Sequence, residues 1–233
     1  MTTQYSTTTT PARFLLLGDS HAGCIGRAAQ AAELSFVGGP LGSGRDFLGP
    51  FFDTDTDTDD LTFRQSETQR LYREFLDTLD VPALAALRVP LVCTFGLSAH
   101  TVATRQNWDL YRDRHGTVAT TFLRSTLFAD LIRATVRGAL AFYDHAAALG
   151  LRVLAPLPPQ RVPGMSDPDV FFAAQDIVVD ELNSRGAELV DLRSRVTDAT
   201  GVQRPAFCQP DDTIHGSLAF GRLVVSELLD RGL

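Results

Sequence analysis

Short apolar runs alternate along the chain with longer segments in which apolar residues recur every three or four positions. The short runs have the length of buried strands and span residues 14–17, 34–40, 89–95, 151–159 and 187–192. The longer segments have the spacing of one helix face and predict helices over 21–34, 66–80, 117–149, 170–185 and 217–231. The pattern therefore predicts five strands separated by helices.

This alternation determines the expected fold. Each helix is a crossover long enough to return right-handed over the sheet, so successive strands are expected to be parallel. We predict an α/β protein, a three-layer α/β/α sandwich with a central, mostly parallel five-stranded sheet of flavodoxin-like character. Residues 13–233 form a single domain in this prediction, after a disordered tail over 1–12. Ligands of such sheets bind beyond the carboxyl ends of the strands, so the residues after each strand are the candidates for function.

Two unusual loop segments follow the second predicted strand. Residues 39–52 are rich in glycine and proline, and residues 53–60 read DTDTDTDD. We predict a mobile, solvated surface loop over 53–60, because its acidic side chains repel one another. A structural or regulatory cation is the alternative, although the run lacks the glycine and closing glutamate of an EF-hand loop at their required offsets.

Net charge and composition narrow the function classes. The formal net charge is −7, whereas nucleic-acid binding needs a clustered basic surface. The chain starts with a polar, threonine-rich segment unlike a secretion signal, and it has no apolar stretch of membrane-spanning length. We expect a cytoplasmic protein that acts on a small molecule, with neither a nucleic-acid nor a membrane partner.

The three cysteines, Cys24, Cys93 and Cys208, are odd in number and widely spaced. They match neither a disulfide framework nor a metal-ligand spacing, so we expect buried free thiols, no metal and no cofactor. Cys24 and Cys208 lie near the motifs described next, where a reactive thiol is the alternative.

The first motif, Gly18-Asp19-Ser20-His21, follows the first predicted strand directly. It places the Ser20 hydroxyl at a helix start, where unpaired backbone N–H groups and the helix dipole favour an oxyanion. Asp and Ser are also preferred helix N-caps, so this tetrapeptide alone does not distinguish a nucleophile from a cap.

The second motif lies just before the last predicted helix, where Asp212 and His215 are three residues apart. In a tight turn this spacing lets a carboxylate accept from the imidazole Nδ1–H while Nε2 faces a hydroxyl, as a general base requires. An Asp-rich turn with a capping histidine is the structural alternative. The two motifs together favour a serine nucleophile with its base.

With both motifs in view, the sequence resembles the SGNH/GDSL hydrolase family. The matching residues are Gly18-Asp19-Ser20-His21 and Asp212-Thr213-Ile214-His215, and the α/β order between them extends the resemblance over nearly the whole chain. The resemblance implies Ser20 as nucleophile, His215 as base, Asp212 as its orienting partner, and the flavodoxin-like sheet. The Ser-His form of the first block is similar to SGNH domains attached to sugar acyltransferases, which hints at O-acyl carbohydrate chemistry.

The family pattern also implies an oxyanion hole made by the Ser20 amide, a glycine after the second strand and an asparagine after the third. Gly44 matches the glycine, with Gly42 as the alternate. Ser98 stands where the asparagine is expected, and its hydroxyl can donate one hydrogen bond but can also rotate away. His100 and Asn107 are alternative N–H donors.

Further candidates for substrate contact are Asp19, His21, Gly42, Arg45 and His100. His21 is either a substrate-facing donor or an ordinary first-turn helix residue, and His100 is either catalytic or a solvent-facing loop histidine. Arg45 and Arg161 follow strand-end loops and could hold a carboxylate or phosphate of the substrate, or be solvated.

The sequence thus predicts a serine esterase that cleaves a small-molecule ester, an O-acyl sugar or a natural product among them, through an acyl-enzyme on Ser20. An acyltransferase or thioesterase would use the same residues. A non-catalytic ligand-binding module on the same fold is the alternative outside the enzymes, favoured by Ser98. A metallophosphoesterase is disfavoured, because the chain lacks the downstream metal-ligand segments of that class.

Overall fold

The computed structural model describes residues 11–55 and 57–233, so most of the predicted tail, residues 1–10, lies outside the described part. All five predicted strands are present: β1 Leu15–Gly18, β2 Val37–Pro40, β5 Leu91–Cys93, β6 Val153–Pro156 and β7 Glu188–Val190. They form one sheet in the order β2-β1-β5-β6-β7, and every neighbouring pair is parallel. The predicted parallel five-stranded sheet is confirmed.

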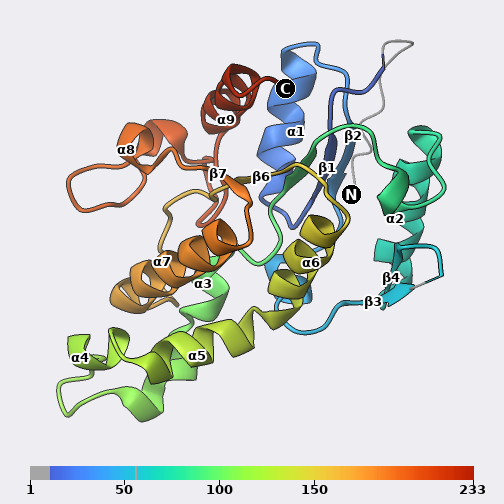
Figure 1. The fold of residues 1–233 in the computed structure, drawn as a ribbon. Helices are drawn as coiled ribbons and strands as arrows, with labels where there is room; N and C mark the ends of the chain where they lie inside the picture. The colour runs from blue at the N-terminus through green and yellow to red at the C-terminus, as the bar shows by residue number, and fades with distance from the viewer. Residues whose placement is uncertain (1–10, 56) are drawn as a thin grey trace.

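Helices cover both faces of this sheet (Figure 1). Leu15 and Leu17 of β1 enter the core on one face and Phe14 and Leu16 the core on the other, because successive strand side chains point in opposite directions. The first core is covered by α2 Ser66–Thr78, α6 Arg137–Ala148 and α7 Pro168–Ser184. The second is covered by α1 Ala22–Ala31 and α9 Leu218–Asp230, which pack against each other. The three-layer prediction is confirmed.

The predicted single helix over 117–149 is wrong, because the segment forms α4 Thr120–Leu123, α5 Thr126–Thr135 and α6. Ser125 starts α5 by accepting a hydrogen bond from the Phe128 amide. At the start of α6 the Gly138 amide donates to the Leu48 carbonyl at 3.0 Å. A Cβ on Gly138 would lie 1.9 Å from the Gly49 carbonyl oxygen, so this contact accepts only glycine. Tertiary contact thus breaks a continuous helical pattern.

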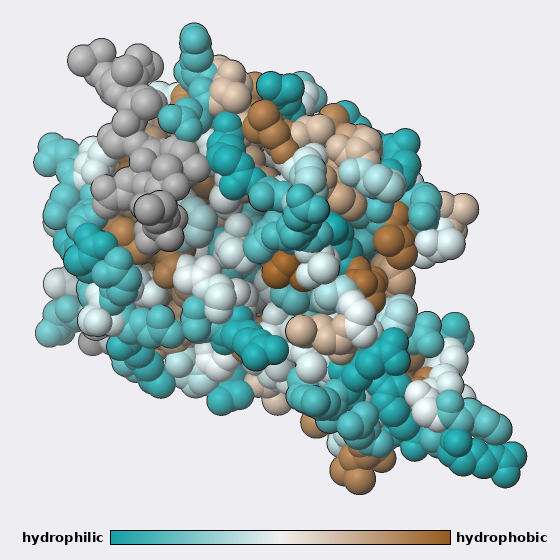
Figure 2. Space-filling view, turned by 180° about the vertical axis from the view of Figure 1, so that it is seen from behind, coloured by the Kyte–Doolittle hydropathy of each residue, from teal (hydrophilic) through white to brown (hydrophobic). Residues whose placement is uncertain are grey.

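The breaks direct α4 and α5 away from the sheet, at the lower left of Figure 1. Both helices lie near α3 Ala99–Val102 and the 3-10 turn Arg105–Tyr111, where the Trp108 ring packs at an angle against the rings of Phe128 and Phe122. Seen from behind, the molecule has a mainly hydrophilic surface with hydrophobic atoms in scattered groups (Figure 2).

The acidic run 53–60 is not wholly a loop, so that prediction is wrong at both of its ends. Strands β3 Phe52–Asp55 and β4 Asp60–Phe63 form an antiparallel hairpin. Asp60 is buried and accepts hydrogen bonds from the Tyr72 hydroxyl, Arg73 and the Leu84 amide. Burial of Leu61 and Phe63 draws β4 against the core, which outweighs the repulsion between the acidic side chains. Thr56 lies outside the described residues.

Six further short elements of the described residues were not predicted: α3, α8 Arg193–Val196 and the 3-10 turns Gly44–Phe47, Leu84–Ala86, Arg105–Tyr111 and Pro205–Phe207. Within residues 11–55 and 57–233, no helix combines the length and apolarity of a membrane span. The described residues also contain no cluster of three or more His, Cys, Asp or Glu side chains arranged to hold a metal ion. All five parallel strands direct their carboxyl ends to one edge of the sheet, where both sequence motifs lie.

Candidate active site

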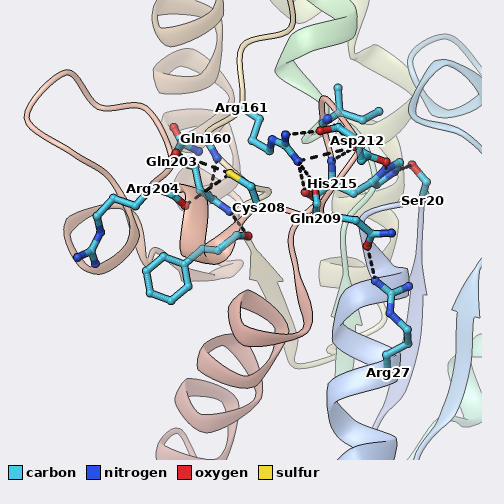
Figure 3. Close-up of polar contacts among 12 residues, drawn as sticks. Ser20, Arg27, Gln160, Arg161, Gln203, Arg204, Cys208, Gln209, Asp212 and His215 are labelled. Carbon is cyan, nitrogen blue, oxygen red and sulfur yellow. Dashed lines mark hydrogen bonds and ion pairs between the residues drawn. The ribbon is translucent and has the colours of Figure 1, made fainter.

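Ser20, His215 and Asp212 are joined by hydrogen bonds at this edge of the sheet (Figure 3). Ser20 Oγ lies 2.8 Å from His215 Nε2, and His215 Nδ1 lies 2.7 Å from Asp212 Oδ2. Because Nδ1 faces a carboxylate, we assign the imidazole proton to Nδ1, which leaves Nε2 to accept from the Ser20 hydroxyl. The structure brings together the three residues that the two motifs predicted.

A local turn explains the spacing between Asp212 and His215. Asp212 Oδ1 accepts hydrogen bonds from the amides of Ile214 and His215, both at 2.7 Å, while Oδ2 faces the imidazole. Burial raises the pKa of Asp212, but hydrogen bonds from the His215 amide, the His215 ring and the Ile214 amide outweigh it, and the net pKa is well below its ordinary value. Asp212 is therefore a carboxylate at neutral pH.

Arg161 stabilises this turn through hydrogen bonds to its backbone (Figure 3). Its guanidinium donates to the carbonyls of Gln209, Asp212 and His215. Three of its five N–H groups thus donate to the backbone that carries the imidazole, and Arg161 lines neither of the cavities around Ser20. This placement disfavours the alternative in which Arg161 binds a substrate anion and favours a role in positioning His215.

Asp19 is fully buried and does not face the cleft, so a substrate contact at this residue is excluded. Its carboxylate accepts from the His21 amide at 2.9 Å, the Thr94 hydroxyl at 3.2 Å and the Ser98 hydroxyl. Burial raises the pKa of Asp19, although these hydrogen bonds oppose the shift. Asp19 ties the loops after β1 and β5 together beneath Ser20.

Ser98 is buried with its hydroxyl donating to Asp19, which removes that proton from the oxyanion role predicted for it. Gly44 packs against Ser98: a Cβ at Gly44 would lie 2.4 Å from Ser98 Oγ. The lack of a side chain therefore lets the Gly44 backbone approach the strand-end residues closely. No acceptor in the described residues receives the amide N–H of Ser20 or Gly44.

His21 and His100 lie close to the His215 imidazole. The His21 ring is 5.3 Å from the His215 ring and 5.6 Å from the His100 ring, centre to centre. Burial lowers the pKa of His21 to about 3, and both of its ring nitrogens are buried without a partner among the described residues. His21 is thus a packing residue behind the site, and the prediction of a substrate-facing donor is wrong.

His100 has a different environment, because it lines a cavity that also contains Ser20 and Gly44. Burial, and then the neighbouring His21, lower the pKa of His100 to about 4, so the ring is neutral at physiological pH and keeps one N–H donor. Asn107, the other alternative donor, is exposed on the 3-10 turn Arg105–Tyr111 and lies outside the cavities around Ser20.

Ser20 lies between two cavities. The larger, of about 520 Å³, is lined by Gly42 and by residues of α1, α2 and the loop that carries His215. The smaller, of about 230 Å³, contains His100, Gly44 and Arg45. The predicted candidates Gly42 and Arg45 thus line different cavities, each of which also includes Ser20.

Several residues of the larger cavity were missed by the sequence reasoning: Gly23, Arg27, Gln65, Glu67, Thr68 and Gln209. For Gly23 and Arg27 a signal existed, since positions three and seven residues after Ser20 lie on the same face of the following helix. Cys24 also lines this cavity, but burial raises the pKa of its thiol to about 12, which disfavours the reactive thiolate.

Comparison with known proteins supports the fold. No protein-family description and no curated protein sequence matches this chain. Among solved structures, a GDSL-like lipase from Bacteroides thetaiotaomicron aligns with a TM-score of 0.50 at 12% identity, over 95% of this chain and 89% of that one. The chain has the SGNH hydrolase fold.

Two further solved structures align less closely. A lipase/acylhydrolase from Enterococcus faecalis has a TM-score of 0.47 at 14% identity, over 94% of both chains. A catalytic mutant of an acetylxylan esterase from Geobacillus stearothermophilus has a TM-score of 0.46 at 14% identity, over 96% of this chain and 95% of that one. At 12% identity, the likeness to the GDSL-like lipase concerns the fold alone.

Proposed function

We propose that the protein is a serine esterase that cleaves a small-molecule ester through an acyl-enzyme on Ser20. One observation carries the proposal: the hydrogen-bonded series Ser20, His215 and Asp212, with distances of 2.8 and 2.7 Å, opens onto two cavities large enough for the two halves of an ester.

The reaction follows from this geometry. As Ser20 Oγ attacks the carbonyl carbon, His215 Nε2 takes the hydroxyl proton, and Asp212 stabilises the resulting imidazolium. His215 then protonates the leaving alcohol as the carbon–oxygen bond of the tetrahedral intermediate breaks. A water molecule, deprotonated by the same nitrogen, hydrolyses the acyl-enzyme and regenerates Ser20.

The oxyanion needs donors, and three groups are in position to supply them. The Ser20 and Gly44 amides have no acceptor within the described chain, and the neutral His100 ring faces the same cavity. We assign the third donor to His100, because the Ser98 hydroxyl is held by Asp19. Such donors stabilise the transition state by about 2.7–4 kcal/mol each in other serine enzymes.

The test compares wild type with Ser20→Ala on 4-nitrophenyl acetate and butyrate, and in parallel on a fluorophosphonate probe detected by intact mass. We expect wild-type turnover and one covalent adduct, and loss of both in the variant, with a fall in kcat on the order of 10⁶-fold. His115→Ala is the matched control, since His115 is exposed and distant in sequence from both motifs.

Product analysis separates the enzyme alternatives. Free acid as the product supports the esterase, whereas transfer to an added alcohol or thioester-specific turnover supports an acyltransferase or thioesterase with the same triad. Absence of both turnover and labelling in wild type would support the non-catalytic module instead.

A further inference from the structure

Arg27 lines the larger cavity. Its side chain extends from α1 toward Gln209 (Figure 3). Its side chain leans toward the helix start: a Cβ on Gly23 would be 3.4 Å from Arg27 Nη1. Gly23 lies next to the backbone of Ser20, because its amide donates to the Ser20 carbonyl at 3.2 Å. The guanidinium therefore lies over Gly23, which has no side chain to fill the cavity, and close to Ser20.

A second contact holds the guanidinium in this place. Arg27 Nη2 donates to Gln209 Oε1 at 3.1 Å, and Gln209 belongs to the same turn as Asp212 and His215. The Gln209 amide also donates to the His215 carbonyl at 3.0 Å. Since a guanidinium has five N–H donors, this contact leaves an edge of Arg27 available to a ligand.

The charge of Arg27 has no carboxylate partner within the described residues. Glu67 is the one carboxylate that lines the cavity, and it is paired with Arg70 at 2.6 Å. In a chain with a formal net charge of −7, this cavity thus presents an unneutralised cation beside the nucleophile.

We propose that the larger cavity binds a carboxylate of the substrate, with Arg27 as its counter-ion, so that the preferred esters carry an acid group a few bonds from the scissile bond. This inference rests on the proposed esterase activity of Ser20. A planar guanidinium suits a carboxylate because two parallel N–H groups can donate to its two oxygens.

The test uses two pairs of esters that differ only in charge. In the first pair the acyl half carries the charge: 4-nitrophenyl glutarate against its terminal carboxamide. In the second pair the alcohol half carries it: 4-acetoxybenzoate against 4-acetoxybenzamide. Wild type, Arg27→Gln, Arg45→Gln and Arg222→Gln are compared by kcat/KM. Arg222 is the matched control, because it is exposed on α9 and does not line either cavity.

We expect wild type to favour the carboxylate by roughly tenfold in one of the two pairs, the discrimination typical of a charge-assisted hydrogen bond. Arg27→Gln should reduce this ratio to about one, because kcat/KM for the carboxylate ester falls more than kcat/KM for the carboxamide, and Arg222→Gln should preserve the ratio. Raising the salt concentration should lower the ratio in wild type and leave it unchanged in Arg27→Gln. The pair that responds identifies which half of the ester occupies the cavity.

Other outcomes overturn the inference. Turnover of both pairs without a charge preference would remove it and leave the esterase proposal intact. A preference lost in Arg45→Gln and retained in Arg27→Gln would place the anion in the smaller cavity. If Ser20-dependent turnover and fluorophosphonate labelling are both absent, the esterase proposal and this inference fall together.

Discussion

Asp19 and Asp212 each belong to one of the two sequence motifs, and the structure gives them opposite electrostatic environments. Asp19 is fully buried beneath Ser20, without a cation, and its pKa is raised by burial. Asp212 is partly exposed, and hydrogen bonds from two amides and an imidazole lower its pKa in spite of burial. The first organises hydroxyls and a backbone turn, whereas the second is placed to stabilise a positive imidazolium. Position in a motif therefore does not determine a carboxylate's role; its donors and its burial do.

Among the variants that test this comparison, Asp212→Asn should have the largest effect on activity. Asp212→Asn is expected to lower kcat on the order of 10⁴-fold, because the amide no longer stabilises the imidazolium and favours the wrong tautomer. Steady-state kinetics on 4-nitrophenyl acetate measures the change, and urea unfolding should show only a small loss of stability. A fall in kcat of less than tenfold would remove Asp212 from the catalytic machinery.

Ser98 and His100 provide the next contrast. The Ser98 hydroxyl donates to Asp19, whereas the His100 ring remains available as an oxyanion donor. His100→Ala should lower kcat by roughly 10²–10³-fold with little change in KM, since an oxyanion donor acts in the transition state. His100→Gln, which retains an N–H donor, should recover part of the loss, and Ser98→Ala should reduce kcat far less. A larger loss in Ser98→Ala than in His100→Ala would return the donor role to Ser98.

Asp19 itself should matter more for stability than for chemistry. Asp19→Ala leaves the Thr94 and Ser98 hydroxyls and the His21 amide without their acceptor, so we expect it to lower the free energy of unfolding by about 2–4 kcal/mol. Urea unfolding measures this. Asp19→Asn retains a carbonyl acceptor and should cost less than half as much; equal losses in the two variants would contradict the hydrogen-bond explanation.

Arg161 donates to the turn that carries Asp212 and His215, so replacing it tests whether this turn must be held in place for activity. Arg161→Gln should lower kcat roughly tenfold, because three carbonyls of the Gln209–His215 turn lose their hydrogen bond from the guanidinium and the imidazole is less well oriented. The KM for 4-nitrophenyl acetate should stay within about twofold. A change confined to KM would instead assign Arg161 to substrate binding.

The smallest effect concerns the pH dependence of stability at His21. Its pKa of about 3 in the folded protein is below the ordinary value of 6.5, so the unfolded chain binds a proton first. The stability that neutral His21 contributes is complete above about pH 6.5 and is lost as the pH falls toward 3. His21→Leu removes this linkage, so the loss of stability between pH 7 and 5.5 should be about 1 kcal/mol smaller than in wild type. Urea midpoints at the two pH values test this, and parallel losses in both proteins would argue against it.

Local patterns in the sequence were enough to predict the three layers of the fold and to identify the two motifs of the candidate site. Strand-length apolar runs and helical spacing report burial directly, and the Asp212–His215 geometry forms within one turn of backbone. The pairing of Ser20 with His215 was therefore predictable, although 195 positions in the sequence separate these two residues.

Contacts between distant segments decided the rest. The break before α6 depends on the approach of Gly138 to Gly49, and burial of Asp60 depends on Tyr72 and Arg73. In the site, the sequence predicted Ser98 as an oxyanion donor, but its hydroxyl donates to Asp19. The sequence also offered Arg161 as a substrate ligand, but its guanidinium donates to backbone carbonyls. The sequence by itself identified Ser20, His215 and Asp212, the residues that the structure joins by hydrogen bonds, because hydroxyl, imidazole and carboxylate groups are recognisable in a local pattern. Only the tertiary structure decided which of their hydrogen-bonding groups remain free, because each partner comes from a remote part of the chain.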